Sequence, residues 1–279
     1  MMIKKHTLFL LLTFPITVFA TTQAFVSVMP LKYFVHRIAG KQLIVHSLVT
    51  PGQTPETYAP TPQQMTELSN SKLYYRIGVP FETTWLKKIK AINPKLKIID
   101  LRDGIELQKN NSSPTLDPHI WNSPVLAKHI AKNIYQSLIN IDPKNQTFYY
   151  KNYLNLSNKL TELHHAIWHK LNELQCRTFL VFHPAWGYFA NTYHLRQIAI
   201  EQEGKSATPQ TLTNIIKLAK KYKLHFIVVS PQISHKEAAA IAREINAKLV
   251  VLDPLAYDYL NNMKFVAETL SSLLQCKKT

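Results

Sequence analysis

The chain has 279 residues, of which 46% are hydrophobic and 18% are charged, as expected of a globular protein. Its six glycines are never closer than 12 positions, so the sequence excludes a GxGxxG dinucleotide loop, a P-loop and a GxSxG nucleophile elbow. No histidine is followed by glutamate, which excludes the HExxH motif of zinc proteases. The commonest enzyme fingerprints are therefore missing from the chain.

The N-terminus has the three parts of a secretory signal. Lys4 and Lys5 precede an apolar run from Thr7 to Ala20, and a small polar segment follows up to Ala24. The run has 14 residues, fewer than the roughly 20 that span a bilayer. We therefore assign residues 1–24 to a signal peptide that is cleaved after Ala20 or Ala24. No cysteine follows the run, so we expect a soluble periplasmic protein without a lipid anchor.

The mature chain is strongly basic. Loss of Lys4 and Lys5 leaves 31 basic against 17 acidic residues, a net charge of +14. Such a charge can indicate a nucleic-acid partner, but here the lysines are scattered singly or in pairs and do not alternate with aromatic residues. We expect a solvated basic surface and no nucleic acid.

About 255 mature residues are enough for two cores, and in each half short β-rich runs alternate with helical spacing. The expected strands are Phe25–Met29, Leu43–Val49, Leu73–Ile77 and Lys97–Leu101 in the first half, and Thr178–Phe182, Arg196–Ile200, Leu224–Val229 and Lys248–Leu252 in the second. We therefore predict an α/β protein with two lobes, each a small parallel sheet flanked by helices.

A long helix is expected between the two halves. Apolar residues recur at steps of three and four from Tyr149 to Leu174, and neither Gly nor Pro occurs from Lys144 to Cys176. Such a helix is about 45 Å long and would form a rigid backbone between the lobes. A coiled-coil dimer is the weaker alternative, because the pattern lasts little more than three heptads; we expect a monomer. The predicted domains are a lobe at 25–143, a backbone helix at 144–175 and a lobe at 176–279.

Four polar side chains follow expected strands, where ligands gather in open parallel sheets. Glu56 follows the second strand, His119 the fourth, His183 the fifth and Asp253 the eighth. Two imidazoles and two carboxylates suit a divalent transition metal. Taken singly, a histidine or aspartate at a strand end is more often a hydrogen-bonding or turn residue, so the residues alone leave both interpretations open.

Two more pairs of residues in the second half need an assignment. Glu201 and Glu203 follow the sixth expected strand and could offer a spare oxygen ligand, but we expect surface acids beside the cleft. Cys176 and Cys276 each end an expected helix and leave two alternatives, one disulfide or two free thiols. A disulfide in an oxidising periplasm would contribute about 4 kcal/mol in the chain-entropy model.

Each of the four candidate ligands lies in a longer segment, and together these segments resemble the zinc/manganese-binding receptors of bacterial ABC transporters, the cluster A-I (cluster 9) family. The segments are Pro51 to Pro60, Asp117-Pro118-His119-Ile120-Trp121, Phe182 to Phe189 and Leu252-Asp253-Pro254-Leu255. The resemblance spans the mature chain. It implies two lobes on a helical backbone, a metal held in the cleft, and delivery to an inner-membrane permease. It also assigns the ligand role to His119, His183 and Asp253.

The chain departs from the family pattern in two places. The family usually has histidine where this chain has Glu56, and an acid is common where it has Ala59. A carboxylate still binds zinc, so we expect a metal site of Glu56, His119, His183 and Asp253. This harder donor set favours manganese or iron over zinc. The alternative is that Glu56 has weakened the metal site. The segment 103–116 also lacks the histidines of zinc-specific relatives.

Three functions follow as hypotheses. The first is a periplasmic receptor, not an enzyme, that captures a divalent metal (zinc first, Mn²⁺ or Fe²⁺ next) and delivers it to an ABC permease. The second is a metal-dependent hydrolase in which a metal-bound water is the nucleophile. The third is a secreted adhesin or binding protein with a vestigial metal site. Four protein ligands would close the coordination sphere, which argues against the hydrolase.

Overall fold

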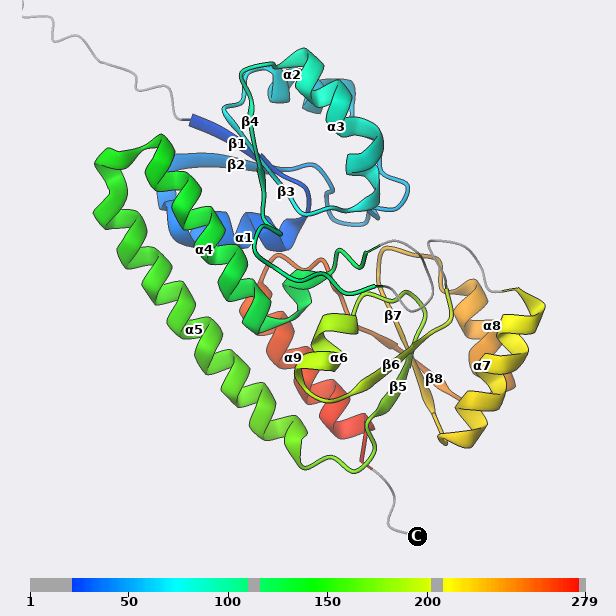
Figure 1. The fold of residues 1–279 in the computed structure, drawn as a ribbon. Coiled ribbons are helices and arrows are strands. Elements are labelled where there is room, and N and C mark those ends of the chain that lie inside the picture. The colour runs from blue at the N-terminus through cyan, green and yellow to red at the C-terminus, as the bar shows by residue number, and fades with distance from the viewer. Residues whose placement is uncertain (1–21, 110–115, 202–207, 276–279) are drawn as a thin grey trace, which may run out of the picture.

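The computed structural model describes residues 22–109, 116–201 and 208–275 and consists of two parallel sheets held by helices (Figure 1). The first sheet has the order β2-β1-β3-β4, formed by β1 (Thr22–Val26), β2 (Leu43–Ser47), β3 (Leu73–Arg76) and β4 (Lys97–Asp100). The second has the order β6-β5-β7-β8, formed by β5 (Thr178–Val181), β6 (Arg196–Ala199), β7 (Phe226–Val229) and β8 (Lys248–Val251). The predicted two-lobed α/β fold is therefore confirmed.

The expected strands all form, and the first one shows the largest shift in its bounds. It was expected at Phe25–Met29 but lies at Thr22–Val26, because Thr22 pairs with Leu43 of β2 and Pro30 occupies the first turn of a helix. Most of the predicted signal peptide lies outside the described residues. Its last three residues, 22–24, belong to β1, and Ala24 is fully buried there.

Most of the helices begin at residues that favour a helix N-terminus. Proline occupies the first turn of several of them, where its missing N–H costs nothing, and the hydroxyls of Thr61, Ser123 and Thr208 cap three helix N-termini. Apart from the long helix between the lobes, the helices are α1 (Met29–Ala39), α2 (Pro62–Ser69), α3 (Pro80–Ile92), α4 (Pro124–Ile141), α6 (Gly187–Thr192), α7 (Pro209–Lys221), α8 (Lys236–Glu244) and α9 (Tyr259–Leu273), with 3₁₀ turns η1 (Gly40–Gln42), η2 (Ile120–Asn122) and η3 (Pro143–Asn145). No helix among the described residues combines the length and the apolar character that a membrane-spanning helix requires.

The long helix α5 (Gln146–Asn172) joins the lobes as expected. Its 27 residues make it about 40 Å long, and it packs against α1, α4 and α9 (Figure 1). It begins two residues later than expected, because Asn145 donates to the Asp142 carboxylate at 2.7 Å in a preceding 3₁₀ turn. It ends three residues earlier, where the Arg177 guanidinium donates to the carbonyl of Asn172.

The lobes are joined by a continuous core and by hydrogen bonds between them. Trp121, fully buried in η2, donates its indole N–H to the carbonyl of Pro254 at 2.7 Å. The neighbouring Asn122 side chain donates to the carbonyl of Ala185 at 2.9 Å. A separate, smaller apolar cluster lies between the second sheet and helices α7 and α8. The segment before α4 is thus fixed to the second lobe.

One cysteine prediction can be followed in the structure. Cys176, just beyond α5, is disulfide-bonded. The free-thiol alternative therefore does not hold for Cys176. Cys276, the other cysteine of the chain, lies outside the described residues.

Candidate metal centre

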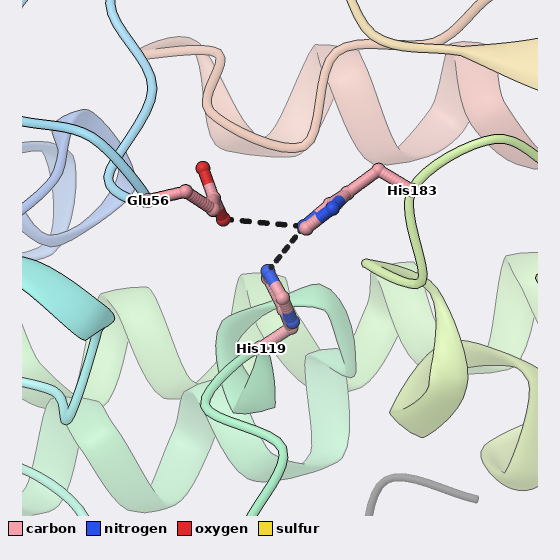
Figure 2. A group of neighbouring side chains, drawn as sticks. All are labelled: Glu56, His119 and His183. Carbon is pink, nitrogen blue, oxygen red and sulfur yellow. Dashed lines mark hydrogen bonds and ion pairs between the residues drawn. The ribbon is translucent and has the colours of Figure 1, made fainter. Parts of the chain in front are cut away.

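Three of the four expected ligands meet between the lobes (Figure 2). Glu56 lies in the connection between β2 and α2, His119 immediately precedes η2, and His183 lies two residues after β5. His183 Nε2 is 3.3 Å from His119 Nε2 and 3.3 Å from Glu56 Oε1. One donor atom from each side chain lies within 4.8 Å of the other two. The chain thus places two imidazole nitrogens and one carboxylate oxygen around a single point.

The spacing of these atoms fits a metal ion. A tetrahedral ion with metal–ligand distances of about 2.0–2.1 Å separates its ligand atoms by about 3.3–3.4 Å, which matches the two distances of 3.3 Å from His183 Nε2. The three side chains line a cavity of about 20 Å³. A volume of roughly 10–15 Å³ already holds one water-sized particle, so this cavity accommodates a single ion and excludes an organic solute.

Asp117 orients His119. Its Oδ1 accepts from the ring Nδ1 at 2.8 Å and from the backbone N–H of His119 at 2.9 Å. Because a carboxylate only accepts, Nδ1 carries the proton and Nε2 presents its lone pair to the other ligands. Gly187 permits this arrangement, since a Cβ there would lie 2.8 Å from Asp117 Oδ2. Asp117 belongs to the same sequence motif as His119, and its place two residues before a candidate ligand is the only sequence signal for this orienting role.

The other two ligands are anchored in the same way. The Nδ1 of His183 lies 3.3 Å from Glu201 Oε2, and the Thr54 hydroxyl donates to Glu56 Oε2. The expectation that Glu201 is a surface acid is wrong, because its residue is 7% exposed and its carboxylate contacts a ligand ring. Glu203 lies outside the described residues. All three candidate ligands are therefore held through the atom that faces away from the others, and the atoms that converge are left for a metal.

The electrostatics of the group favour a cation. Burial alone would lower the pKa of His183, but its hydrogen bonds to Glu201 and Glu56 and the charges of both carboxylates raise that pKa to about 10. For Glu56, burial alone would raise the pKa, yet the hydrogen bond and charge of His183, with that of His119, hold it below its ordinary value. Three carboxylates thus surround two imidazoles, and the site attracts positive charge.

Asp253, the fourth expected ligand, is not part of the group formed by the other three. Its Oδ1 accepts from Gln232 Nε2 at 2.6 Å and from the backbone N–H of Leu255 at 2.8 Å. Asp253 borders a neighbouring cavity of about 270 Å³, while Gln232 lines both that cavity and the small one. Gln232 follows β7 and carries no recognisable sequence signal, so it was not among the expected site residues.

Comparison with known proteins agrees with this geometry. The family described as zinc-uptake complex component A, periplasmic, matches residues 25–273. The chain belongs to this family. It is 28% identical over 256 residues to a "putative metal-binding protein" of Chlamydia trachomatis, covering 90% of this chain and 91% of the relative. It is 26% identical to the manganese ABC transporter substrate-binding lipoprotein PsaA of Streptococcus anginosus, covering 84% of each. The crystal structure of a zinc-bound ZnuA deletion mutant is 38% identical, with a TM-score of 0.88, and the match covers 92% of this chain and 99% of the other.

Family membership settles the class of protein. The chain is the metal-binding component of a transporter that works outside the cytoplasm, and it is not an enzyme. The resemblance stated from the four segments is therefore confirmed, and the hydrolase hypothesis is not supported.

Proposed function

We propose that Glu56, His119 and His183 bind one divalent transition metal between the lobes and that the chain presents this ion to an inner-membrane ABC permease. The observation that carries the proposal is that each candidate ligand is held by a hydrogen bond to the side-chain atom that faces away from the point where the three side chains converge. Thr54, Asp117 and Glu201 fix the three side chains so that one oxygen and two nitrogens converge. Such outer partners orient ligands and raise their basicity in metal sites.

We propose zinc as the first cargo, with manganese or iron next. The separation of 3.3 Å between ligand atoms suits the short bonds of tetrahedral zinc. Glu56 in place of a histidine adds a hard oxygen donor and moves the preference toward manganese or iron. Both metals occur among relatives, since a zinc-bound ZnuA and a manganese-binding PsaA resemble this chain.

We further propose that the mature chain begins after Ala20, is monomeric and carries no lipid anchor. Cleavage there leaves β1 whole, whereas cleavage after Ala24 would remove three of its five residues and Thr22 would no longer pair with Leu43. The PsaA relative is named as a lipoprotein, so the mass of the mature N-terminal peptide from the native host tests the cleavage site and the absence of a lipid anchor. A lipid-modified peptide would contradict the absence of an anchor.

The decisive experiment offers zinc, manganese and iron together to the mature protein and determines bound metal after dialysis. We expect about one equivalent, mostly zinc, in the native chain and less than about a tenth in Glu56→Ala and His183→Ala. Glu106→Ala, an exposed acid, is the control and should keep the native amount. Glu56→His should retain the metal and raise the ratio of zinc to manganese. Failure of the native chain to retain any metal would favour the vestigial-site hypothesis.

A further inference from the structure

Gln232 has a buried polar atom with no partner beside the metal ligands. It follows β7 and lines the same small cavity as Glu56, His119 and His183. Its Oε1 is buried and accepts no hydrogen bond from any residue that the structure describes. Leaving a buried acceptor without a hydrogen-bond partner is unfavourable, so a feature of this kind in a binding cavity points to a ligand.

Asp253 fixes the direction in which this oxygen points. Asp253 Oδ1 accepts from Gln232 Nε2 at 2.6 Å, and the backbone N–H of Leu255 donates to the same oxygen at 2.8 Å. The Asn262 side chain donates to the backbone carbonyl of Asp253 at 2.7 Å. A carboxylate only accepts hydrogen bonds, so the amide must turn its nitrogen toward Asp253 and its oxygen away from it.

We propose that Gln232 Oε1 is the fourth donor to the metal ion and that Asp253 is a positioning residue that holds the Gln232 amide. This inference rests on the proposed function, since it needs an ion bound by Glu56, His119 and His183. Amide oxygens are ordinary ligands of divalent cations. The ion supplies the partner that Oε1 lacks, and the resulting site has two nitrogen and two oxygen donors.

The assignment accounts for two features of the site. Three protein ligands with an open position are typical of catalytic zinc centres, and a fourth ligand closes the sphere, as a carrier requires. Asp253 borders the larger cavity and Gln232 stands between that cavity and the small one. A substitution at Asp253 therefore acts on the ion through the amide of Gln232.

The test compares four variants by competition for Zn²⁺ with a chromophoric chelator. Gln232→Leu removes the donor and should raise the dissociation constant about 10–100-fold. Gln232→Glu keeps an oxygen donor but loses the N–H that Asp253 accepts, so its dissociation constant should rise less than that of Gln232→Leu. Asp253→Asn retains an oxygen that can accept from both Gln232 and Leu255, so its constant should change by no more than a few-fold. Gln210→Leu, an exposed glutamine of α7, is the matched control.

A second readout separates a lost ligand from a general loss of fold. Co²⁺ reports its ligands in its visible absorption bands, and we expect these bands to change in Gln232→Leu and to stay as in the native chain in Asp253→Asn and Gln210→Leu. Thermal unfolding of the metal-free proteins shows whether each variant folds, and Gln232→Ala replaces Gln232→Leu if the latter does not.

Two results would overturn the inference. The first is a Gln232→Leu protein with native affinity and native Co²⁺ bands. The second is a Gln232→Leu effect smaller than that of Asp253→Asn, which would make Asp253 itself the ligand. His183→Ala is measured beside these variants. If the native chain binds zinc, His183→Ala binds it poorly and Gln232→Leu binds it as the native chain does, then only the role of Gln232 is refuted. A native chain without metal affinity would instead refute the proposed function.

Discussion

If His183 binds the metal as proposed, the ion must displace the proton of its ring, and we expect this competition to set the pH dependence of loading. The pKa of His183 is raised from 6.5 to about 10, because Glu201 and Glu56 lie against the two nitrogens of its ring. Metal binding requires the neutral imidazole and so releases the proton. At pH 7 this release costs about 4 kcal/mol, from about 1.36 kcal/mol for each of about three pH units. The apparent affinity at pH 7 is therefore expected to be about 1,000-fold below its limit at high pH.

Affinity and proton release can be measured independently. With a competing chelator, the apparent dissociation constant for zinc should fall about tenfold per unit between pH 7 and pH 9. Calorimetry in two buffers of different ionisation enthalpy counts the protons and should give about one per ion near pH 8. A dissociation constant that does not vary with pH, together with release of less than about 0.3 proton, would refute this reasoning.

The same proton affects the stability of the metal-free protein. The pKa of His183 is higher in the folded state than in the unfolded state, so the folded state binds more protons between pH 6.5 and pH 10. The stability that this proton contributes is fully present below about pH 6.5 and is lost as the pH rises through about 10. The free energy of unfolding should fall by about 1.4 kcal/mol per pH unit in that interval. In the metal-loaded protein, this dependence on the His183 proton should be absent.

Glu201 provides the matched perturbation. Glu201→Gln removes one of the two carboxylates that hold the proton on His183, so the steep part of the affinity profile should move to lower pH. Glu244→Gln changes an exposed acid at the end of α8 and should leave the profile in place. Identical profiles for the two variants would contradict the role assigned to Glu201.

Three further changes have expected outcomes. Glu82 is 1% exposed, and its carboxylate accepts hydrogen bonds from Ser27, Arg76 and the backbone N–H groups of residues 77 and 78. Glu82→Ala should therefore lower the free energy of unfolding, measured by urea titration, by about 3–5 kcal/mol. A loss below about 1 kcal/mol would contradict this. In Gly187→Ala, the new Cβ meets Asp117 Oδ2, so zinc affinity measured by chelator competition should fall about 10–100-fold; native affinity would show that Asp117 does not orient His119. Cys176→Ser should cost about 2–5 kcal/mol through loss of its disulfide, and an unchanged thermal midpoint would show that the bond adds no stability.

Local patterns in the sequence were enough to predict the architecture. The β-rich runs and the steps of three and four along α5 are properties of neighbouring residues, and periodicity records them directly. The same holds for the placement of three of the candidate ligands, Glu56, His119 and His183, because the carboxyl ends of parallel strands lie at one edge of each sheet. The bounds of β1 shifted because Thr22 pairs with Leu43, a partner distant in the sequence. The end of α5 shifted because Arg177, five residues beyond Asn172, donates to its carbonyl, a side-chain contact that apolar periodicity does not record.

The chemistry of the site depended on contacts that no local pattern encodes. His119 and His183 lie 64 positions apart in the chain, and their rings meet only because η2 packs against the second lobe. Glu201 looked like a surface acid until the fold buried it beside His183. Asp253 has the position that the sequence predicted, but the backbone N–H of Leu255 and the amide of Gln232 take up its Oδ1. Sequence periodicity thus determined the layers and the strand ends, and tertiary packing decided which polar atoms at those ends face one another, because that choice depends on side-chain hydrogen bonds across the lobes.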